Sequence, residues 1–293
     1  MILQVIANGI IAGCVYALVA LGFGLIYKTT RVLHFAHGAV YTASAYAFYS
    51  LSILLSISTV ISVIIALSVG IVLGIAVESF LYYPLYNKKV PFVISFISSM
   101  GIYLFLINLI AMLFGNEVKI LQPGLEKTYQ FAGVILTRTQ IIEVIVFVIV
   151  FFGFYIFMKK SGLGRLIRAL SNNPELATVL GMNVRKTRIL VFGLGSLLAS
   201  ISGLLVALDI GIDPNIGFSA IFVCAVAVII GGVDLFEGAV LGAFLLGLIQ
   251  NIIIWKLSAR WQEAITFGIL IIFLLLRPQG ILSYKKRMEE ISQ

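Results

Sequence analysis

The chain has 293 residues, of which 61% are hydrophobic and only 11% are charged, and its formal net charge is +8. Since a soluble domain averages about 25% charged residues, this composition excludes a water-soluble globular protein and indicates an integral membrane protein. The positive charge does not indicate nucleic-acid binding, because the basic residues lie in short loops between apolar runs, where they set membrane orientation. We therefore expect the lipid bilayer as a partner and no nucleic acid.

Apolar runs follow one another along the chain, and most have the roughly 20 residues that a helix needs to cross the hydrocarbon core. The nine runs cover residues 3–27, 35–56, 58–81, 91–114, 140–158, 189–208, 217–232, 238–255 and 264–276. They lack the period-2 pattern of an outer-membrane barrel. The run at 217–232 is short enough to be re-entrant, and the first part of 35–56 is similarly ambiguous. The sequence predicts an all-α, polytopic transmembrane helical bundle of eight or nine segments, with residues 1–293 as one domain.

Lysine and arginine predict how the segments are oriented. Residues 28–34, 82–90, 159–188 and the tail from Arg277 together hold 15 of the 20 basic residues. The positive-inside rule places these segments, and hence the C-terminus, in the cytoplasm, and nine spans then place the N-terminus outside. The loop at 115–139, with a turn at Pro123-Gly124, is the longest outer stretch; it is either part of an external docking surface or a plain connector.

Residues 159–188 interrupt the apolar chain with a basic and polar segment that carries helix signals. Asn173 can cap a helix, Pro174 suits its first turn, Glu175 favours its positive end and Gly181 can close it. This pattern predicts a short helix of about two turns outside the membrane. Such a helix is suited to docking a soluble partner in the cytoplasm.

Sequence motifs for catalysis or for a metal are absent. There is no Gly-x4-Gly-Lys-Ser/Thr phosphate loop, so ATP hydrolysis by that route is not expected. His34 and His37 share an i, i+3 spacing but have no further ligands nearby, so we expect His34 at the interface and His37 either packed against a helix or lining a pathway. No acidic residue lies clearly at the midplane, which argues against an ion-coupled carrier and for a subunit that is powered by a partner. We expect no catalytic residue, no cofactor and no metal.

Four short motifs resemble a known family. Residues 175–181 look like the Glu-Ala-Ala-x3-Gly coupling loop of ABC importer permeases, with Leu176 in place of the middle Ala. The motifs Phe-Ala-His-Gly at 35–38, Asp-Pro-Asn-Ile-Gly at 213–217 and Arg-Pro-Gln-Gly-Ile at 277–281 occur in the order seen in branched-chain amino acid permeases of the LivH type. The likeness covers essentially the whole chain.

The resemblance implies a non-enzymatic, multi-pass permease subunit in the cytoplasmic membrane of a prokaryote. Its implied partners are ATP-binding cassette subunits in the cytoplasm, a second, LivM-like permease subunit and an extracytoplasmic substrate-binding protein. Branched-chain amino acids are the implied substrates. Ala39, Lys28 and the acidic stretch 233–238 depart from the family pattern and leave open urea, short-chain amides or other amino acids as alternatives.

The resemblance also assigns candidate site residues. The coupling loop is residues 159–188, and its expected ATPase-coupling residues are Pro174, Glu175, Ala177, Gly181 and Arg168. Stretches 35–42 and 217–232 are candidates for the translocation pathway, because glycine-rich broken helices can present backbone groups to a zwitterion. The pathway candidates are Phe35, His37, Gly38, Gly217, Gly231 and Gly232. For each of these, tight packing without substrate contact is the alternative.

Overall fold

The computed structural model describes residues 1–121, 126–131, 133–233, 235–277 and 279–282, and of Glu175 it describes only the backbone. The chain is almost entirely helical. The helices are α1 (Ile2–Thr30), α2 (Ala36–Tyr49), α3 (Thr59–Val77), α4 (Tyr83–Asn87), α5 (Phe92–Phe114), α6 (Arg138–Lys160), α7 (Gly162–Asn172), α8 (Pro174–Val179), α9 (Val184–Ile210), α10 (Ile216–Gly231), α11 (Phe236–Lys256) and α12 (Gln262–Leu276). Two π-helical turns, Ser50–Leu54 and Glu78–Tyr82, continue α2 and join α3 to α4.

Within the described residues, seven helical stretches are long and apolar enough to cross a membrane. They correspond to α1, α3 with α4, α5, α6, α9, α11 and α12. The two runs that were ambiguous in the sequence form the two short helices, since α2 has 14 residues and α10 has 16. The predicted polytopic helical bundle is confirmed. The third predicted run, 58–81, corresponds to a helical stretch that begins at Thr59 and continues to Asn87, so this stretch ends later than expected.

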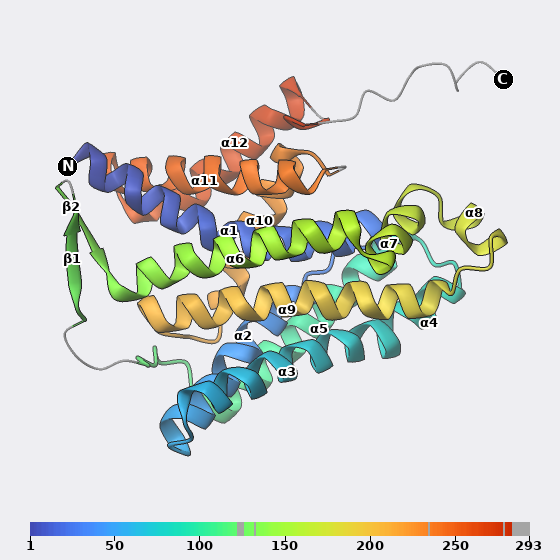
Figure 1. The fold of residues 1–293 in the computed structure, drawn as a ribbon, viewed down its shortest axis with the longest axis horizontal. Coiled ribbons are helices and arrows are strands. Elements are labelled where there is room, and N and C mark those ends of the chain that lie inside the picture. The colour runs from blue at the N-terminus through green and yellow to red at the C-terminus, as the bar shows by residue number, and fades with distance from the viewer. Residues whose placement is uncertain (122–125, 132, 234, 278, 283–293) are drawn as a thin grey trace.

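Helix α1 forms the centre of the bundle, with α6, α9 and α11 running alongside it (Figure 1). Small residues permit the close approach. A Cβ added at Gly9 would lie 2.9 Å from the Cα of Leu248, so α1 and α11 touch through their backbones at this point. In lipid, where burial from water does not drive helix association, such close contact is a principal source of packing energy.

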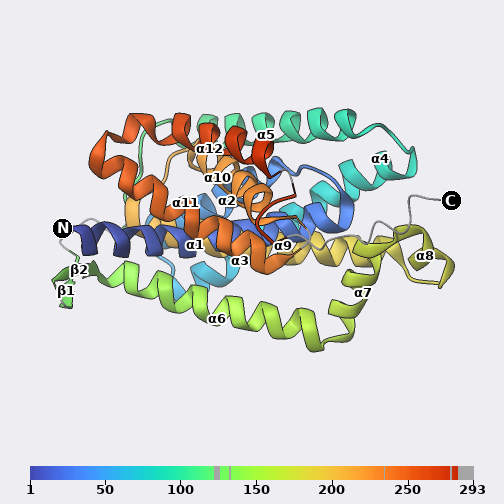
Figure 2. The same cartoon turned by 90° about the horizontal axis from the view of Figure 1, so that it is seen from above.

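The two ends of the bundle differ. In both views α4, α7 and α8 lie at one end, whereas the N-terminus and the strands β1 (Thr128–Phe131) and β2 (Val134–Thr137) lie at the other (Figures 1 and 2). The strands form an antiparallel hairpin within the loop at 115–139. The expected turn at Pro123-Gly124 lies outside the described residues. The basic segments after α4 and after α6 therefore gather at one end of the bundle, as the positive-inside grouping requires.

Candidate coupling site

The segment between α6 and α9 forms two short helices that extend from one end of the bundle (Figure 2). Ser161 caps α7 by accepting a hydrogen bond from the N–H of Gly164 at 2.8 Å. Asn173 caps α8 by accepting one from the N–H of Leu176 at 2.9 Å, and Pro174 occupies the first turn. The predicted short helix and its N-cap are confirmed.

The C-terminal end of α8 is closed by a Schellman motif. The N–H of Met182 donates to the carbonyl of Ala177, and the N–H of Gly181 donates to that of Thr178, both at 3.0 Å. Gly181 has a φ of +79°, a left-handed conformation that glycine adopts without the steric cost borne by other residues. Both ends of α8 are therefore set by local sequence, which makes the helix a defined element despite its six residues.

The surface of α8 is apolar and exposed, which is unusual for a segment outside the membrane. Ala177 is buried against the rest of the chain. On the other side Leu176, Val179 and Leu180 are 53%, 82% and 71% exposed. We call these three residues the α8 patch. An apolar patch with polar surroundings marks an interaction site. Arg168, by contrast, belongs to α7 and lines a cavity together with residues of α6 and α11, away from the α8 patch.

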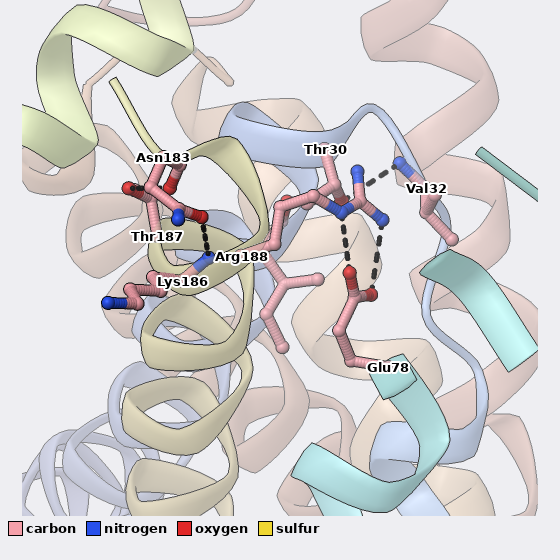
Figure 3. A network of polar contacts seen from close by, with 8 residues as sticks. Thr30, Val32, Glu78, Asn183, Lys186, Thr187 and Arg188 are labelled. Atoms are coloured by element: carbon pink, nitrogen blue, oxygen red, sulfur yellow. Dashed lines mark hydrogen bonds and ion pairs between the residues drawn. The ribbon is translucent and has the colours of Figure 1, made fainter. Parts of the chain in front are cut away.

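A buried ion pair joins the base of α9 to α3. Asn183 caps α9 by accepting a hydrogen bond from the N–H of Lys186 at 2.9 Å, and Arg188 lies one turn further along. The guanidinium of Arg188 donates to both carboxylate oxygens of Glu78, at 2.5 and 3.1 Å (Figure 3). The two side chains are only 3% and 1% exposed. A bidentate pair in this geometry fixes α9 to the π-helical turn that begins at Glu78.

The same π-helical turn contacts α5 and the loop before α2. Tyr82 lies four residues after Glu78, and its hydroxyl donates to Ser99 Oγ of α5 at 2.6 Å. His34 Nδ1 lies 2.9 Å from that hydroxyl, and Ser99 Oγ also accepts a hydrogen bond from the N–H of Ala36. His34 is fully buried within the protein, and its expected depth at the membrane interface stays a prediction. The π-helical turn therefore contacts the base of α9 through Glu78, and α5 and the loop before α2 through Tyr82.

The pathway candidates fall into two packing contacts at the two ends of α10. At the first, Phe35, His37 and Gly38 are buried, and a Cβ at Gly38 would lie 2.5 Å from the carbonyl oxygen of Gly217. At the second, a Cβ at Gly231 would collide with Gly238. The six residues thus lie at or beside close packing contacts, and their role in transport stays a prediction.

The packing contact at the C-terminal end of α10 also includes the motif at 277–281. The N–H groups of Ile281 and Leu282 donate to the carbonyls of Ile230 and Gly231 at 2.8 and 2.9 Å. Gly232 has a φ of +104° where the chain leaves α10. A Cβ added at Gly280 would lie 2.5 Å from the Cα of Gly232. Helix α10 therefore brings the motifs at 35–38, 213–217 and 277–281 into one unit, although Pro278 lies outside the described residues.

Comparison with known proteins assigns this arrangement to a family. Residues 5–274 match the family model described as "Branched-chain amino acid transport system / permease component". The chain belongs to this family. The resemblance to LivH-type permeases is confirmed, and the protein is a multi-pass membrane permease rather than an enzyme.

Relatives match over nearly the whole permease. It is 31% identical to the high-affinity branched-chain amino acid transport system permease protein BraD of Pseudomonas aeruginosa, across 96% of this chain and 95% of that protein. It is 29% identical to the corresponding permease protein LivH of Escherichia coli, with the same coverage. Among solved structures it is similar to PsaBC from Streptococcus pneumoniae in complex with Fab, with a TM-score of 0.54, 16% identity, and coverage of 93% of this chain and 91% of that chain. At this identity the likeness shows the fold alone.

Sequence reasoning missed the ion pair of the permease. The basic residues of 159–188, which include Arg188, predict only the orientation, and Glu78 lies near the end of the apolar run 58–81 without an evident partner. The missed signal is that a carboxylate within an apolar run requires a partner, because an unpaired charge there is costly. The identity of that partner was not accessible from spacing, since the two residues are 110 positions apart.

Proposed function

We propose that this permease is the membrane-spanning subunit of an ABC importer for branched-chain amino acids, in the cytoplasmic membrane of a prokaryote. Separate ATP-binding cassette subunits would supply the energy. The observation that carries the proposal is the α8 patch: a doubly capped helix outside the bundle, apolar on its exposed side, between two helices long enough to span the membrane. The similarity to BraD and LivH, which are branched-chain amino acid transport permeases, supports the substrate class.

In this proposal the end that carries α8 is cytoplasmic, as is the C-terminus, and residues 159–188 act as the coupling loop of a single-domain permease. The α8 patch fits a groove of an ATPase subunit, while Pro174, Glu175, Ala177 and Gly181 define the helix that is held there. Closure of the ATPase subunits pushes α8, and the push tilts α6 and α9, which flank it. The bidentate contact of Arg188 with Glu78 passes that tilt to α3 and, through Tyr82 and Ser99, to α5.

A second permease subunit, LivM-like, would complete the pathway. The face that carries α5 and α12, with α2 and α10 between them, suits this contact (Figures 1 and 2). Helix α5, which is mostly apolar, exposes Asn108 and Gly101. A polar amide in a span favours a protein neighbour over lipid. A substrate-binding protein would dock at the opposite end of the permease, outside.

The test is ATP-driven uptake of L-leucine into proteoliposomes that contain the complete transporter. Val179→Asp places a charge in the α8 patch and is expected to abolish uptake and to release the ATPase subunits during purification. Val118→Asp is the matched control for retention of the ATPase subunits, because Val118 is 62% exposed and follows α5 at the opposite end of the bundle. Unchanged uptake by Val179→Asp would contradict docking at α8.

A further inference from the structure

A cavity of about 690 Å³ lies toward the end of the bundle opposite α8. Its walls come from seven helices: α1, α2, α6, α9, α10, α11 and α12. None of the six pathway candidates from the sequence lines it. The candidate stretches 35–42 and 217–232 do contribute to its wall, for example through Tyr41 and Phe222, but neither the motifs nor the coupling loop accounts for the carboxylates of this outer cavity.

Three carboxylates line the outer cavity: Glu143 and Asp209 on facing helices, and the exposed Glu263 of α12, which accepts a hydrogen bond from Ser219 at 3.4 Å. Glu143 of α6 is only 2% exposed, and Asp209 of α9 is half-buried. Within the described part of the chain neither Glu143 nor Asp209 has a hydrogen-bond donor or an ion-pair partner, and their like charges act on each other. A buried carboxylate without a partner is costly, and an ionisable group inside a membrane protein marks a functional site. The arrangement points to a cation supplied from outside the chain.

The rest of the wall is rigid and largely apolar. The amide of Gln250 is held by Tyr16, Thr266 and Gln262, each at 2.9 Å, so it ties α1, α11 and α12 together. Because these bonds satisfy the amide, it does not compete for the carboxylates. Aliphatic and aromatic side chains make up the apolar part of the wall, among them Val15, Val19, Val223, Phe222 and Phe267.

One positive charge stands at the rim. Arg260 is exposed, and it is the one cationic residue among the described residues that line the cavity. The outer cavity thus combines buried negative charge, an apolar wall and a rim that carries Arg260 together with the exposed Glu263. These features match an ammonium group, a branched aliphatic side chain and a carboxylate.

We propose that the outer cavity binds a small apolar amino acid through its ammonium group, with Glu143 and Asp209 as acceptors. This inference rests on the proposed function and deepens it, since it names the part of the permease that recognises the charged amine. The aliphatic side chain packs against the apolar wall, and Arg260 attracts the carboxylate at the rim. A charge-assisted hydrogen bond is worth more than a neutral one, so the amine contributes most of the selectivity.

Direct binding to the full-length permease in lipid nanodiscs tests the inference. The probes are L-leucine, isoamylamine, which keeps the amine and the side chain, and isocaproate, which keeps the carboxylate and the side chain. Intrinsic fluorescence reports binding, because Trp261 adjoins the lining residues Arg260 and Gln262. Leucine and isoamylamine are expected to bind saturably and isocaproate is not.

Substitution of the carboxylates gives the sharper comparison. Glu143→Gln keeps the shape and removes the charge, and it should weaken isoamylamine binding roughly tenfold to hundredfold. Asp209→Asn should weaken it less, and Glu143→Asp should retain more affinity than Glu143→Gln. Glu117→Gln is the matched control, because the Glu117 side chain is 92% exposed and lies outside the cavity. The affinity of this variant for isoamylamine should equal that of the wild type.

Two results would overturn the inference: wild-type affinity of Glu143→Gln for isoamylamine, or equal binding of isocaproate. If Glu143→Gln fails to fold, Asp209→Asn decides, and wild-type affinity of that variant likewise overturns it. Failure of the proposed function looks different. In that case isoamylamine binding still depends on Glu143, while the complete transporter takes up no leucine.

Discussion

Removing one partner of the buried pair between Glu78 and Arg188 should strongly destabilise the permease. The guanidinium makes two hydrogen bonds to the carboxylate, and neither side chain is more than 3% exposed. Glu78→Gln leaves Arg188 charged and without a counter-ion in a site that water barely reaches. Loss of one member of a buried pair costs about 3–5 kcal/mol. The free energy of unfolding, measured by SDS titration in mixed micelles, should fall by an amount in this range.

A matched surface pair gives the control. Glu117 lies 3.8 Å from Lys119, and its side chain is 92% exposed, so solvent screens the interaction. Glu117→Gln should change the free energy of unfolding far less than Glu78→Gln. If both substitutions have the same small effect, the reasoning from burial is refuted.

A double substitution separates stability from coupling. Replacing a buried ion pair by apolar residues of similar size is often neutral or stabilising, so Glu78→Leu with Arg188→Met should restore the free energy of unfolding. The bidentate link between α9 and the π-helical turn is nevertheless gone. We expect fewer leucine molecules transported per ATP hydrolysed by the reconstituted transporter. A stable double variant with the wild-type ratio would show that the pair is only structural.

Three further predictions concern single positions. Gly181→Val forces a β-branched residue into φ +79°, so α8 should lose its Schellman cap, and ATP-driven uptake should fall while membrane insertion, measured by fractionation, is unchanged. Tyr82→Phe removes the hydroxyl that donates to Ser99 and should lower the free energy of unfolding in SDS by about 1–3 kcal/mol, whereas equal stability would contradict the contact. Gly217→Val should prevent close contact of α10 with Gly38 and reduce the yield of folded permease in size-exclusion chromatography, and a normal yield would mean that the helices can separate without cost.

Local features of the fold were predictable because their causes are local. Asn173, Pro174 and Gly181 set the two ends of α8 through contacts within a few residues, and the sequence therefore predicts that helix correctly. Hydropathy likewise predicts the apolar helices, since spanning the bilayer fixes their length. The break of the second run into a 14-residue helix and a π-helical turn depends on packing, and periodicity does not reveal it.

The site was less predictable because its parts are distant in sequence. Gly38 and Gly217 were singled out from motifs, but their contact appears only when α2 meets α10. Glu143 lies within the apolar run 140–158, yet its burial in a cavity depends on six other helices. A polar residue in an apolar run shows that something must satisfy it, and only the folded chain shows what does.

The central claim is that α8 contacts the ATPase subunit, and site-specific cross-linking tests it most directly. Cys14 and Cys224 are buried, so a cysteine introduced by Val179→Cys can be labelled selectively with a photoactivatable cross-linker in the assembled transporter. The account predicts a cross-link from position 179 to the ATPase subunit and none from Val118→Cys. A cross-link from position 118, with none from position 179, would contradict it.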